Sequence, residues 1–507
     1  MRFTMARNPL LRKKYILCWK NVLILFAVFI LNCIACQNTT VGIAVALAEA
    51  TIVIILSLLG KTDRAILANN IFLGVSIEAS LFVFGEYTYI YSYAYMPFIH
   101  RWGCLCCELF ILLCVIFKQN GRTKISLKND IKNLWSGQFV FGFVLLVFTG
   151  IFSSLVTIIT NDNHVNNTSW FYGAYATEIC YWIILIINLV LVYFALRHNC
   201  KFYVQFKEVL INFFIVLVIA SWASVILGWH GTYSYHKSIL LMPLVAFFSI
   251  TTIICTNFKE YQKTPMFIFA IIGFICMCIK TSPLLGKWIL VIGVTIATYF
   301  WINIAHKKFF KMLMVIILVC ISIAVFGEYF TRSNELLLYK IGQTTESLKI
   351  GRGSWLDNVP NSPKVRIEEF VNVFLEYLDK PWYVFFGKGI GGTITQQTNW
   401  VDWASSSGAF SVNQRQSGIY NELHESINIM FLKFGLLGLI FFIYNFMKGL
   451  KGIKKSPWIL MGLLWFSFYV NAYISMYIVA SAFLLGMYEC DISSGLIKKM
   501  KNRHKEF

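Results

Sequence analysis

The residues best suited to chemistry lie in one stretch of the chain, between positions 327 and 424. Arg366 stands at the start of a helical pattern, and His424 stands where the next apolar run begins. A guanidinium binds phosphate oxygens through paired hydrogen bonds, and a histidine that is neutral near pH 7 can accept a proton from a hydroxyl group. A lone histidine at a helix start more often has a structural role, so the surroundings must decide.

The segment 363–380 has the spacing of an amphipathic helix. Ser362 can cap it, and Pro363 suits its first turn. We expect this helix to lie on the membrane surface or across the ends of membrane spans, with its apolar face inward. That apolar face comprises Ile367, Phe370, Val371, Phe374 and Leu378.

A glycine run and a polar segment follow this helix. Gly387, Gly389, Gly391 and Gly392 permit a tight turn and a close approach of backbones. The polar segment that continues to position 422 contains two tryptophans and many Ser, Gln and Asn residues. It is compatible with a mobile surface loop and, equally, with a lid that faces carbohydrate, because aromatic faces and amide groups suit sugars.

The composition is that of an integral membrane protein. The 507 residues are 58% hydrophobic and 13% charged, whereas a soluble domain carries about 25% charged residues. The basic start leads into an apolar run without a clear cleavage site, which predicts a retained first helix. Most of the 14 cysteines sit in apolar runs and none lies within 327–423, so we expect free thiols.

Apolar runs long enough to span a bilayer predict an all-α polytopic membrane protein with about 14 transmembrane helices. The predicted spans are 19–36, 41–59, 66–85, 98–117, 137–159, 175–196, 208–228, 239–257, 265–280, 286–304, 311–327, 426–447, 457–471 and 473–488.

The distribution of positive charge predicts the orientation of these spans. With the N-terminus in the cytoplasm, the cytoplasmic segments hold or border about 30 of the 44 Lys and Arg residues. Both termini are then cytoplasmic and the 327–423 loop is extracytoplasmic. This loop has nine Lys and Arg against ten Asp and Glu. The net charge of +20 is thus a topology signal, with anionic lipid headgroups rather than nucleic acid as its partner.

The predicted organisation has four parts. Residues 1–326 form a transmembrane bundle of about 11 spans, and 327–423 form one large extracytoplasmic loop with amphipathic helices. Residues 424–488 form the C-terminal transmembrane helices, and 489–507 form a basic cytoplasmic tail.

Two short external loops are also distinctive. The tyrosine-rich loop 85–102 suits an interfacial aromatic belt or a surface that stacks on sugars. The loop 229–238 contains His230, His236 and Lys237, but no acidic residue or cysteine accompanies the histidines, so we expect no metal site there.

One combination of motifs resembles a known family. It comprises Arg366, the following helix, Pro381, the glycine run at 387–392, His424, and the pattern F-x-x-F-G-L-L-G-L-I at 431–440. In this order, these residues resemble the O-antigen ligase and polymerase superfamily of bacterial envelope enzymes over roughly 208–447. The resemblance implies a GT-C-like membrane fold and a metal-independent glycosyltransferase that needs no cofactor. It implies that His424 is catalytic and that Arg366 binds a lipid diphosphate.

The chain departs from the family pattern at two places. Where the family has an arginine at the outer end of a span, this chain offers Lys280 and Lys287. Where the family often has an acid before the last glycine motif, this chain has Lys433, and we expect Glu49 or Glu78 to be its partner. Further candidates for lining the substrate path are Arg352, Gly389, Gly391, Arg415, His236 and Lys237.

These observations favour a polymerase of undecaprenyl-diphosphate-linked oligosaccharides in the bacterial cytoplasmic (inner) membrane, acting in lipopolysaccharide or capsule biosynthesis. A single displacement at the sugar would invert the anomeric centre. The donor and the acceptor would both be lipid-linked, and a regulator of chain length is an expected partner. The alternative within the family is an O-antigen ligase that moves finished glycan onto lipid A–core. The alternative from another class is a flippase for the same lipid-linked units, although the chain shows no internal repeat.

Overall fold

The computed structural model describes residues 19–84, 96–119, 138–162, 171–226, 268–273, 361–405, 412–421, 423–452, 458–462 and 480–490, with a few isolated positions between them. Within these residues the fold is all-α apart from one two-stranded ribbon. Its helices are α1 (Trp19–Gln37), α2 (Thr39–Leu58), α3 (Thr62–Phe84), α4 (Met96–Gln119), α6 (Gln138–Ile159), α7 (Phe171–His198), α8 (Cys200–Ile226), α15 (Asn361–Leu378), α16 (Trp382–Phe386), α17 (Val412–Ser417) and α18 (Ser426–Gly452). Strands β1 (Ile394–Thr395) and β2 (Ile419–Tyr420) pair antiparallel, with Ile394 opposite Tyr420.

Eight predicted spans coincide with helices of the structure, namely α1 to α4, α6 to α8 and α18. Six of the described helices are long and apolar enough to cross a membrane; they include α1, α2 and α18. Their outer faces carry large apolar side chains, such as Phe152 and Ile159 of α6, which are 69% and 83% exposed. Such faces suit lipid rather than water. The other six predicted spans, at 239–327 and 457–488, lie wholly or partly outside the described residues.

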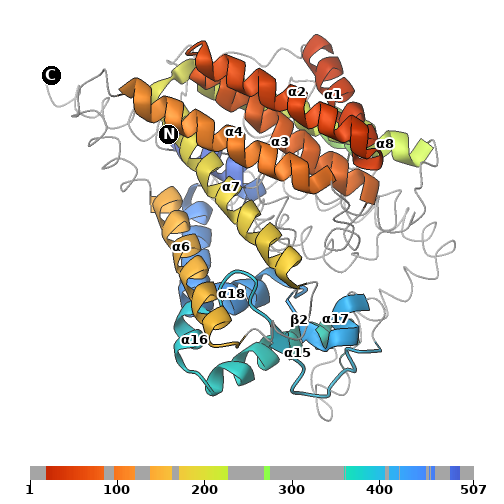
Figure 1. The fold of residues 1–507 in the computed structure, drawn as a ribbon, viewed down its shortest axis with the longest axis vertical. Helices are drawn as coiled ribbons and strands as arrows, with labels where there is room; N and C mark the ends of the chain where they lie inside the picture. Colours follow the sequence, from red (N-terminus) through yellow and green to blue (C-terminus); the bar gives the residue numbers. More distant parts are fainter. Residues whose placement is uncertain are drawn as a thin grey trace, which may run out of the picture.

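Two groups of helices divide the described part of the chain. Helices α1 to α4 pack on one another, with α8 beside α1 and α3 (Figure 1). Helices α6 and α18 run side by side at a distance from this layer, and α7 slants from one group to the other (Figure 1). Only Asn38 separates α1 from α2. Its side chain caps α2 by accepting from the backbone N–H groups of Thr40 and Val41.

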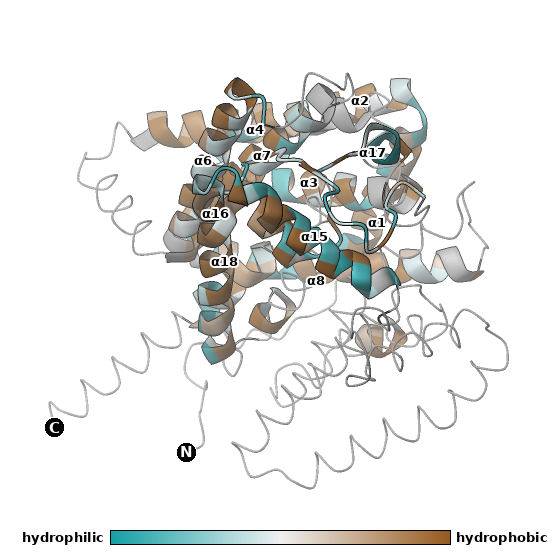
Figure 2. Cartoon of the chain, turned by 90° about the horizontal axis from the view of Figure 1, so that it is seen from below, coloured by the Kyte–Doolittle hydropathy of each residue, from teal (hydrophilic) through white to brown (hydrophobic). Residues whose placement is uncertain are grey.

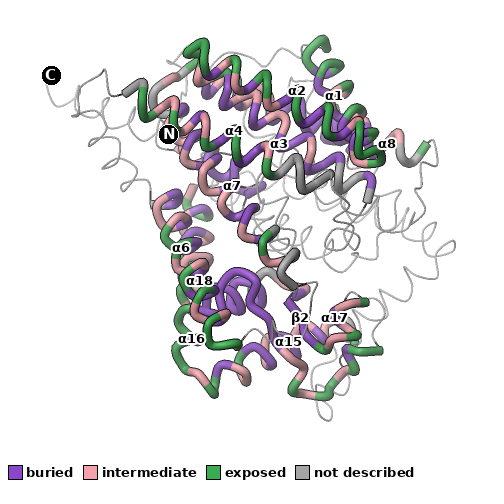
Figure 3. The backbone as a smooth tube through the Cα atoms, in the orientation of Figure 1, coloured by how far each residue is buried: buried purple, intermediate pink, exposed green. Residues whose placement is uncertain are grey.

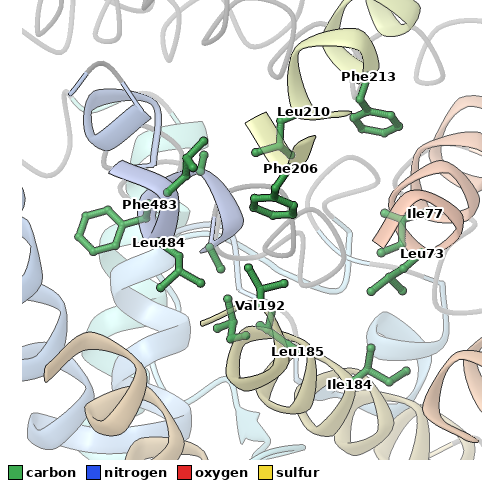
Figure 4. Close-up of a cluster of buried hydrophobic side chains, with 14 of the residues drawn as sticks. Leu73, Ile77, Ile184, Leu185, Val192, Phe206, Leu210, Phe213, Phe483 and Leu484 are labelled. Atoms are coloured by element: carbon green, nitrogen blue, oxygen red, sulfur yellow. The ribbon is translucent and has the colours of Figure 1, made fainter. Parts of the chain in front are cut away.

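A continuous apolar core joins the two groups. Leu73 and Ile77 of α3, several residues of α7 and α8, and Phe483 gather in one cluster (Figure 4). Aromatic contacts continue this core into the α6–α18 pair, where Phe143 and Phe434 each pack against Trp182. The core therefore fixes α6 and α18 relative to α7.

Helices α15, α16 and α17 lie together at one end of the α6–α18 pair (Figure 1). Helix α16 packs mainly on α18 and also contacts α6, and α15 packs on α18, α16 and β1. A separate cluster of buried apolar side chains, including Tyr377, Trp403 and Phe431, holds this part together. This region contains both chemically suited residues, Arg366 and His424.

Candidate active site

Helix α15 buries a face of mixed polarity, which differs from the apolar face that its spacing predicted; Val373 and Tyr377 are buried on it as well as polar side chains. Glu368, Glu369 and Asn372 are fully buried, whereas Phe374 and Leu378 are 43% and 56% exposed. The helix is marked by alternating hydrophilic and hydrophobic residues along its length (Figure 2). The inward carboxylates are compatible with burial because each receives several hydrogen bonds from segments far away in sequence.

Glu369 and His424 form a close pair. His424 directs its ring Nδ1 at the Glu369 carboxylate, and its backbone N–H donates to the same carboxylate at 3.0 Å. Asn428 of α18 donates to Glu369 Oε2 at 2.9 Å. The carboxylate orients the ring and holds the proton on Nδ1, which leaves the basic lone pair on Nε2. The His424 side chain retains 21% exposure, so solutes can reach it.

Arg366 lies one helical turn before Glu369 on α15. It binds Glu425, the residue that follows His424. Its Nε donates to Glu425 Oε1 at 2.7 Å. Asn428 bridges the two pairs, because it also donates to the backbone carbonyl of Arg366 at 2.8 Å. The fold therefore places Arg366 and His424 in one hydrogen-bonded network, in which Glu425 is the acidic partner of Arg366 and Glu369 that of His424.

The polar segment after the glycine run is anchored by Glu368. This carboxylate accepts from the backbone N–H groups of Trp400 and Val401 and from the Trp403 indole at 2.9 Å. Trp403 is fully buried, while Trp400 is 37% exposed. Of these two tryptophans, only Trp400 is substantially exposed. Helix α15 therefore holds residues 393–403 of the polar segment in place, which disfavours a mobile loop over this range.

The glycine run makes a buried turn against a break in α18. Gly435 has φ 58° and ψ −149°, which interrupts the helix. The carbonyls of Leu432 and Lys433, released by this break, accept from the backbone N–H groups of Lys388 and Gly389 at 2.8 and 3.0 Å. A Cβ on Gly435 would lie 2.6 Å from the backbone of Phe385, so only glycine fits. An interrupted helix at membrane depth is tolerated where protein covers it.

Helix α6 provides the other wall of this turn, which we call the glycine turn (Gly387–Gly392). Ser153 and Thr157 donate to the carbonyls of Gly387 and Lys388, and Ile390 donates from its backbone to the Gly150 carbonyl. The chain is exposed at α16 and buried where it turns in beside α18 (Figure 3). The turn thus fixes α16, and with it the end of α15, onto the membrane helices.

Two buried lysines belong to this region. Lys388 lies within the glycine turn and pairs with Glu376 of α15. Lys433 pairs with Glu178 of α7, which also accepts from the backbone N–H of Gly391 at 3.1 Å. The predicted partners of Lys433 were wrong: Glu49 accepts instead from Asn32 at 3.0 Å, and Glu78 has no hydrogen-bond partner among the described residues. Helix α7, rather than an early span, lies against α18 at this depth.

Asp162, just after α6, binds two residues at the junction of α15 and α16. It accepts from Lys380 and from the Tyr383 hydroxyl at 2.6 Å. Burial acts to raise the pKa of Asp162, but hydrogen bonds from Lys380, Thr160 and Tyr383 outweigh it, so this pKa lies below its ordinary value. Burial, followed by the bond to Asp162, raises the pKa of Tyr383 to about 12.

The remaining predicted site residues have varied locations. Gly389 and Gly391 are buried against α6 and α7, where an added Cβ would meet Ser154 and Tyr175. Arg415 lies on α17, and its buried Nε has no partner within the described residues. Five candidates lie outside the described residues, namely His236, Lys237, Lys280, Lys287 and Arg352.

The sequence reasoning missed three residues of the site: Glu369, Glu425 and Asn428. A signal for Glu369 was present, since it stands three positions after Arg366 and so shares its helix face. No pattern in the sequence predicts that this face of the 363–380 helix contacts residues 424–428. The described residues include no group of three or more His, Cys, Asp and Glu side chains that could hold a metal ion.

Fold and site together define an all-α membrane protein with several spans and a carboxylate–histidine pair at one end of its helices. Comparison with protein families and with curated proteins finds no match: no family model matches the chain, and no curated protein does.

Proposed function

We propose that this protein is a glycosyltransferase that polymerises lipid-diphosphate-linked oligosaccharide units. The observation that carries the proposal is the Glu369–His424 pair, with Arg366 one helical turn away on α15. A base oriented by a buried carboxylate and a cation that can bind phosphate are the two groups that such a transfer requires. The family resemblance of the sequence motifs supports the same class.

The proposed reaction is a single displacement. A hydroxyl oxygen of the incoming unit attacks the anomeric carbon of the growing glycan, and the bond from that carbon to the lipid diphosphate breaks. The hydroxyl proton passes to Nε2 of His424, and the lipid diphosphate leaves with its electron pair. The anomeric centre is inverted.

Cationic side chains would stabilise the departing diphosphate, on which negative charge grows during the transfer. Arg366 is the first of these, because the Glu425 carboxylate holds its guanidinium beside His424. Lys280 and Lys287 are the proposed additional cations. A lysine supplies a point charge rather than the bidentate fork of an arginine.

We further propose that the α15–α17 region faces the outside of the bacterial cytoplasmic membrane, where lipid-linked units are assembled. Several features support this placement: both ends of the chain are basic, the 327–423 segment is nearly neutral, and α16 joins the apolar helices. A lipid-anchored diphosphate at the membrane surface would then lie at the level of Arg366.

The test is polymerisation in vitro with purified protein and defined lipid-linked units. We expect His424→Ala and Arg366→Ala each to abolish polymer, a loss of at least about 10²-fold, because base and cation act in the same step. Lys364→Ala, on the same helix, is the matched control and should retain activity. Normal chain lengths from either site variant would exclude this site.

A gene deletion separates the polymerase from the two alternatives. Surface glycans of a single repeat indicate a polymerase, whereas full-length polymer left on the carrier lipid indicates a ligase. For a flippase, lipid-linked units would cross the bilayer of liposomes that contain the purified protein, and no polymer would form.

A further inference from the structure

A second buried polar cluster lies where α3, α4 and α7 pack together, away from α15 in sequence. Glu108 of α4 is fully buried, and its Oε1 accepts from the side-chain amides of Asn69 at 3.2 Å and Asn188 at 3.1 Å. Asn69 belongs to α3 and Asn188 to α7, and they are 2% and 1% exposed. The proposed transfer uses none of these three side chains. Ionisable groups inside a membrane helix bundle are rare and usually functional.

Two oxygen atoms of this cluster lack a hydrogen-bond donor in the described residues. They are Oε2 of Glu108 and Oδ1 of Asn188, and both are buried. An ionised carboxylate only accepts hydrogen bonds, as does an amide oxygen, so neither atom can satisfy the other. Each buried, unsatisfied polar group lowers the stability of the folded state. When Glu108 is charged, these two buried oxygens therefore both lack a hydrogen-bond donor, and the surrounding described side chains supply none.

One hydrogen atom removes both deficits. A proton on Glu108 Oε2 makes that oxygen a donor, and the Asn188 Oδ1 acceptor belongs to the residue that already donates to Oε1. The neutral acid and the amide then form a two-bond pair, in which each partner donates once and accepts once. The deficit therefore points to a proton as the missing ligand.

The neighbours of Glu108 also disfavour its charged form. Cys104 of the same helix lies within electrostatic range of Glu108, Glu49, Cys107 and Cys180. When ionised, all of these groups are negative. No lysine or arginine of the described residues acts on Glu108, whose interacting side chains are Asn188 and Asn69. A divalent cation would find two unsatisfied oxygens, whereas Mg²⁺ and Ca²⁺ take about six to eight ligands.

We propose that Glu108 is a proton-binding site, and that the bound proton closes an acid–amide lock between α4 and α7 through Asn188. Asn69 extends this lock to α3. Loss of the proton leaves a carboxylate opposite the Asn188 oxygen in apolar surroundings, so the contact between α4 and α7 weakens. This site is independent of the proposed glycosyltransferase reaction.

Glu108→Gln is the decisive variant, because glutamine reproduces the neutral acid. Its amide Nε2 can donate to Asn188 Oδ1, while its oxygen accepts from Asn188 Nδ2. In thermal unfolding of the detergent-purified protein, we expect Glu108→Gln to keep the wild-type Tm and Glu108→Ala to lose several degrees. Because the folded wild type holds a proton that its unfolded chain releases, its Tm should fall relative to Glu108→Gln as the pH rises.

Infrared spectroscopy tests the proton directly, and it needs only variants that fold. The band of a protonated carboxylic acid should lose intensity in Glu108→Gln. Glu78→Gln is the matched control, because Glu78 is an equally buried glutamate on α3 whose carboxylate has no hydrogen-bond partner within the described residues. The part of the band due to Glu108 must persist in this control.

Three results would overturn the proposal. The first is an unchanged acid band in Glu108→Gln. The second is a loss of Tm in Glu108→Gln as large as that in Glu108→Ala, which would mean that the negative charge itself is required. The third is a wild-type Tm that rises with added Na⁺ and no longer does so in Glu108→Gln, which would identify a metal cation as the ligand.

Discussion

Glu368 and Glu369 are neighbours on α15, both fully buried, and they hold different parts of the molecule. Glu368 binds the backbone of the 396–403 segment, so its role is to shape the polar loop. Glu369 binds the ring and the backbone of His424 and therefore controls the candidate base. Because consecutive helical residues diverge by about 100°, one turn of α15 can serve the loop and the histidine separately.

Glu369→Gln should impair catalysis through the tautomer of His424. The glutamine amide can donate to Nδ1, which would move the ring proton to Nε2 and remove the base. We expect polymerisation to fall about 10²-fold.

Glu425→Gln is the companion variant for this measurement. It changes the residue that holds Arg366 and leaves Glu369 in place, so KM for the lipid-linked donor should change more than kcat. A wild-type kcat in Glu369→Gln would show that the carboxylate is structural only.

The glycine turn is the element that connects the site to the membrane helices. It inserts between α6 and α18, and its backbone groups bond to released carbonyls of α18 and to hydroxyl groups of α6. Three ion pairs secure it: Lys433 with Glu178 inside, Lys388 of the turn with Glu376 of α15, and Lys380 with Asp162 at the outer end. A displacement of this turn would move α16 and the end of α15 together.

The inner ion pair should be costly to break on one side only. Lys433→Met leaves the Glu178 carboxylate buried without its cation, and we expect a loss of about 3–5 kcal/mol. The double variant Lys433→Met/Glu178→Gln should recover most of that loss, because glutamine still offers an oxygen to Gly391. Thermal or denaturant unfolding in detergent measures both. Equal destabilisation of the single and double variants would contradict this account.

The outer ion pair should depend on pH in the acid range. Because the folded pKa of Asp162 lies below its ordinary value of 3.8, its bonds stabilise the fold above that pH and are lost as the pH falls through the folded pKa. Asp162→Asn should therefore lower the Tm at pH 5 to 7, and the difference from wild type should shrink below pH 3.8. A difference that is constant with pH would mean that packing, not charge, stabilises this junction.

At the scale of the whole molecule, the two polar centres lie in different parts of the helix assembly. The Glu369–His424 pair lies at one end of α6 and α18, and Glu108 lies among α3, α4 and α7 (Figure 1). Helix α7 contributes to the packing beside each of them: Glu178 pairs with Lys433 next to the glycine turn, and Asn188, ten positions later, donates to Glu108.

The proposed orientation predicts the accessibility of two exposed positions. Ser405 follows the anchored polar segment, and Lys451 lies near the end of α18. In intact cells freed of their outer envelope, a membrane-impermeant maleimide should label Ser405→Cys above the wild-type background and should not label Lys451→Cys until the membrane is opened. The reverse pattern would invert the topology and place the site in the cytoplasm.

The amino-acid sequence was enough to predict a bundle of membrane helices, and it located most of the described ones within a few residues. The reason is local: an apolar run in lipid must satisfy its own backbone, which makes it a helix. The motif order also selected Arg366 and His424. That α15 turns its carboxylates inward and that Lys433 meets Glu178 follow only from the packing of distant segments. These choices depend on hydrogen-bond partners that are 32 to 255 residues away, which no local periodicity records.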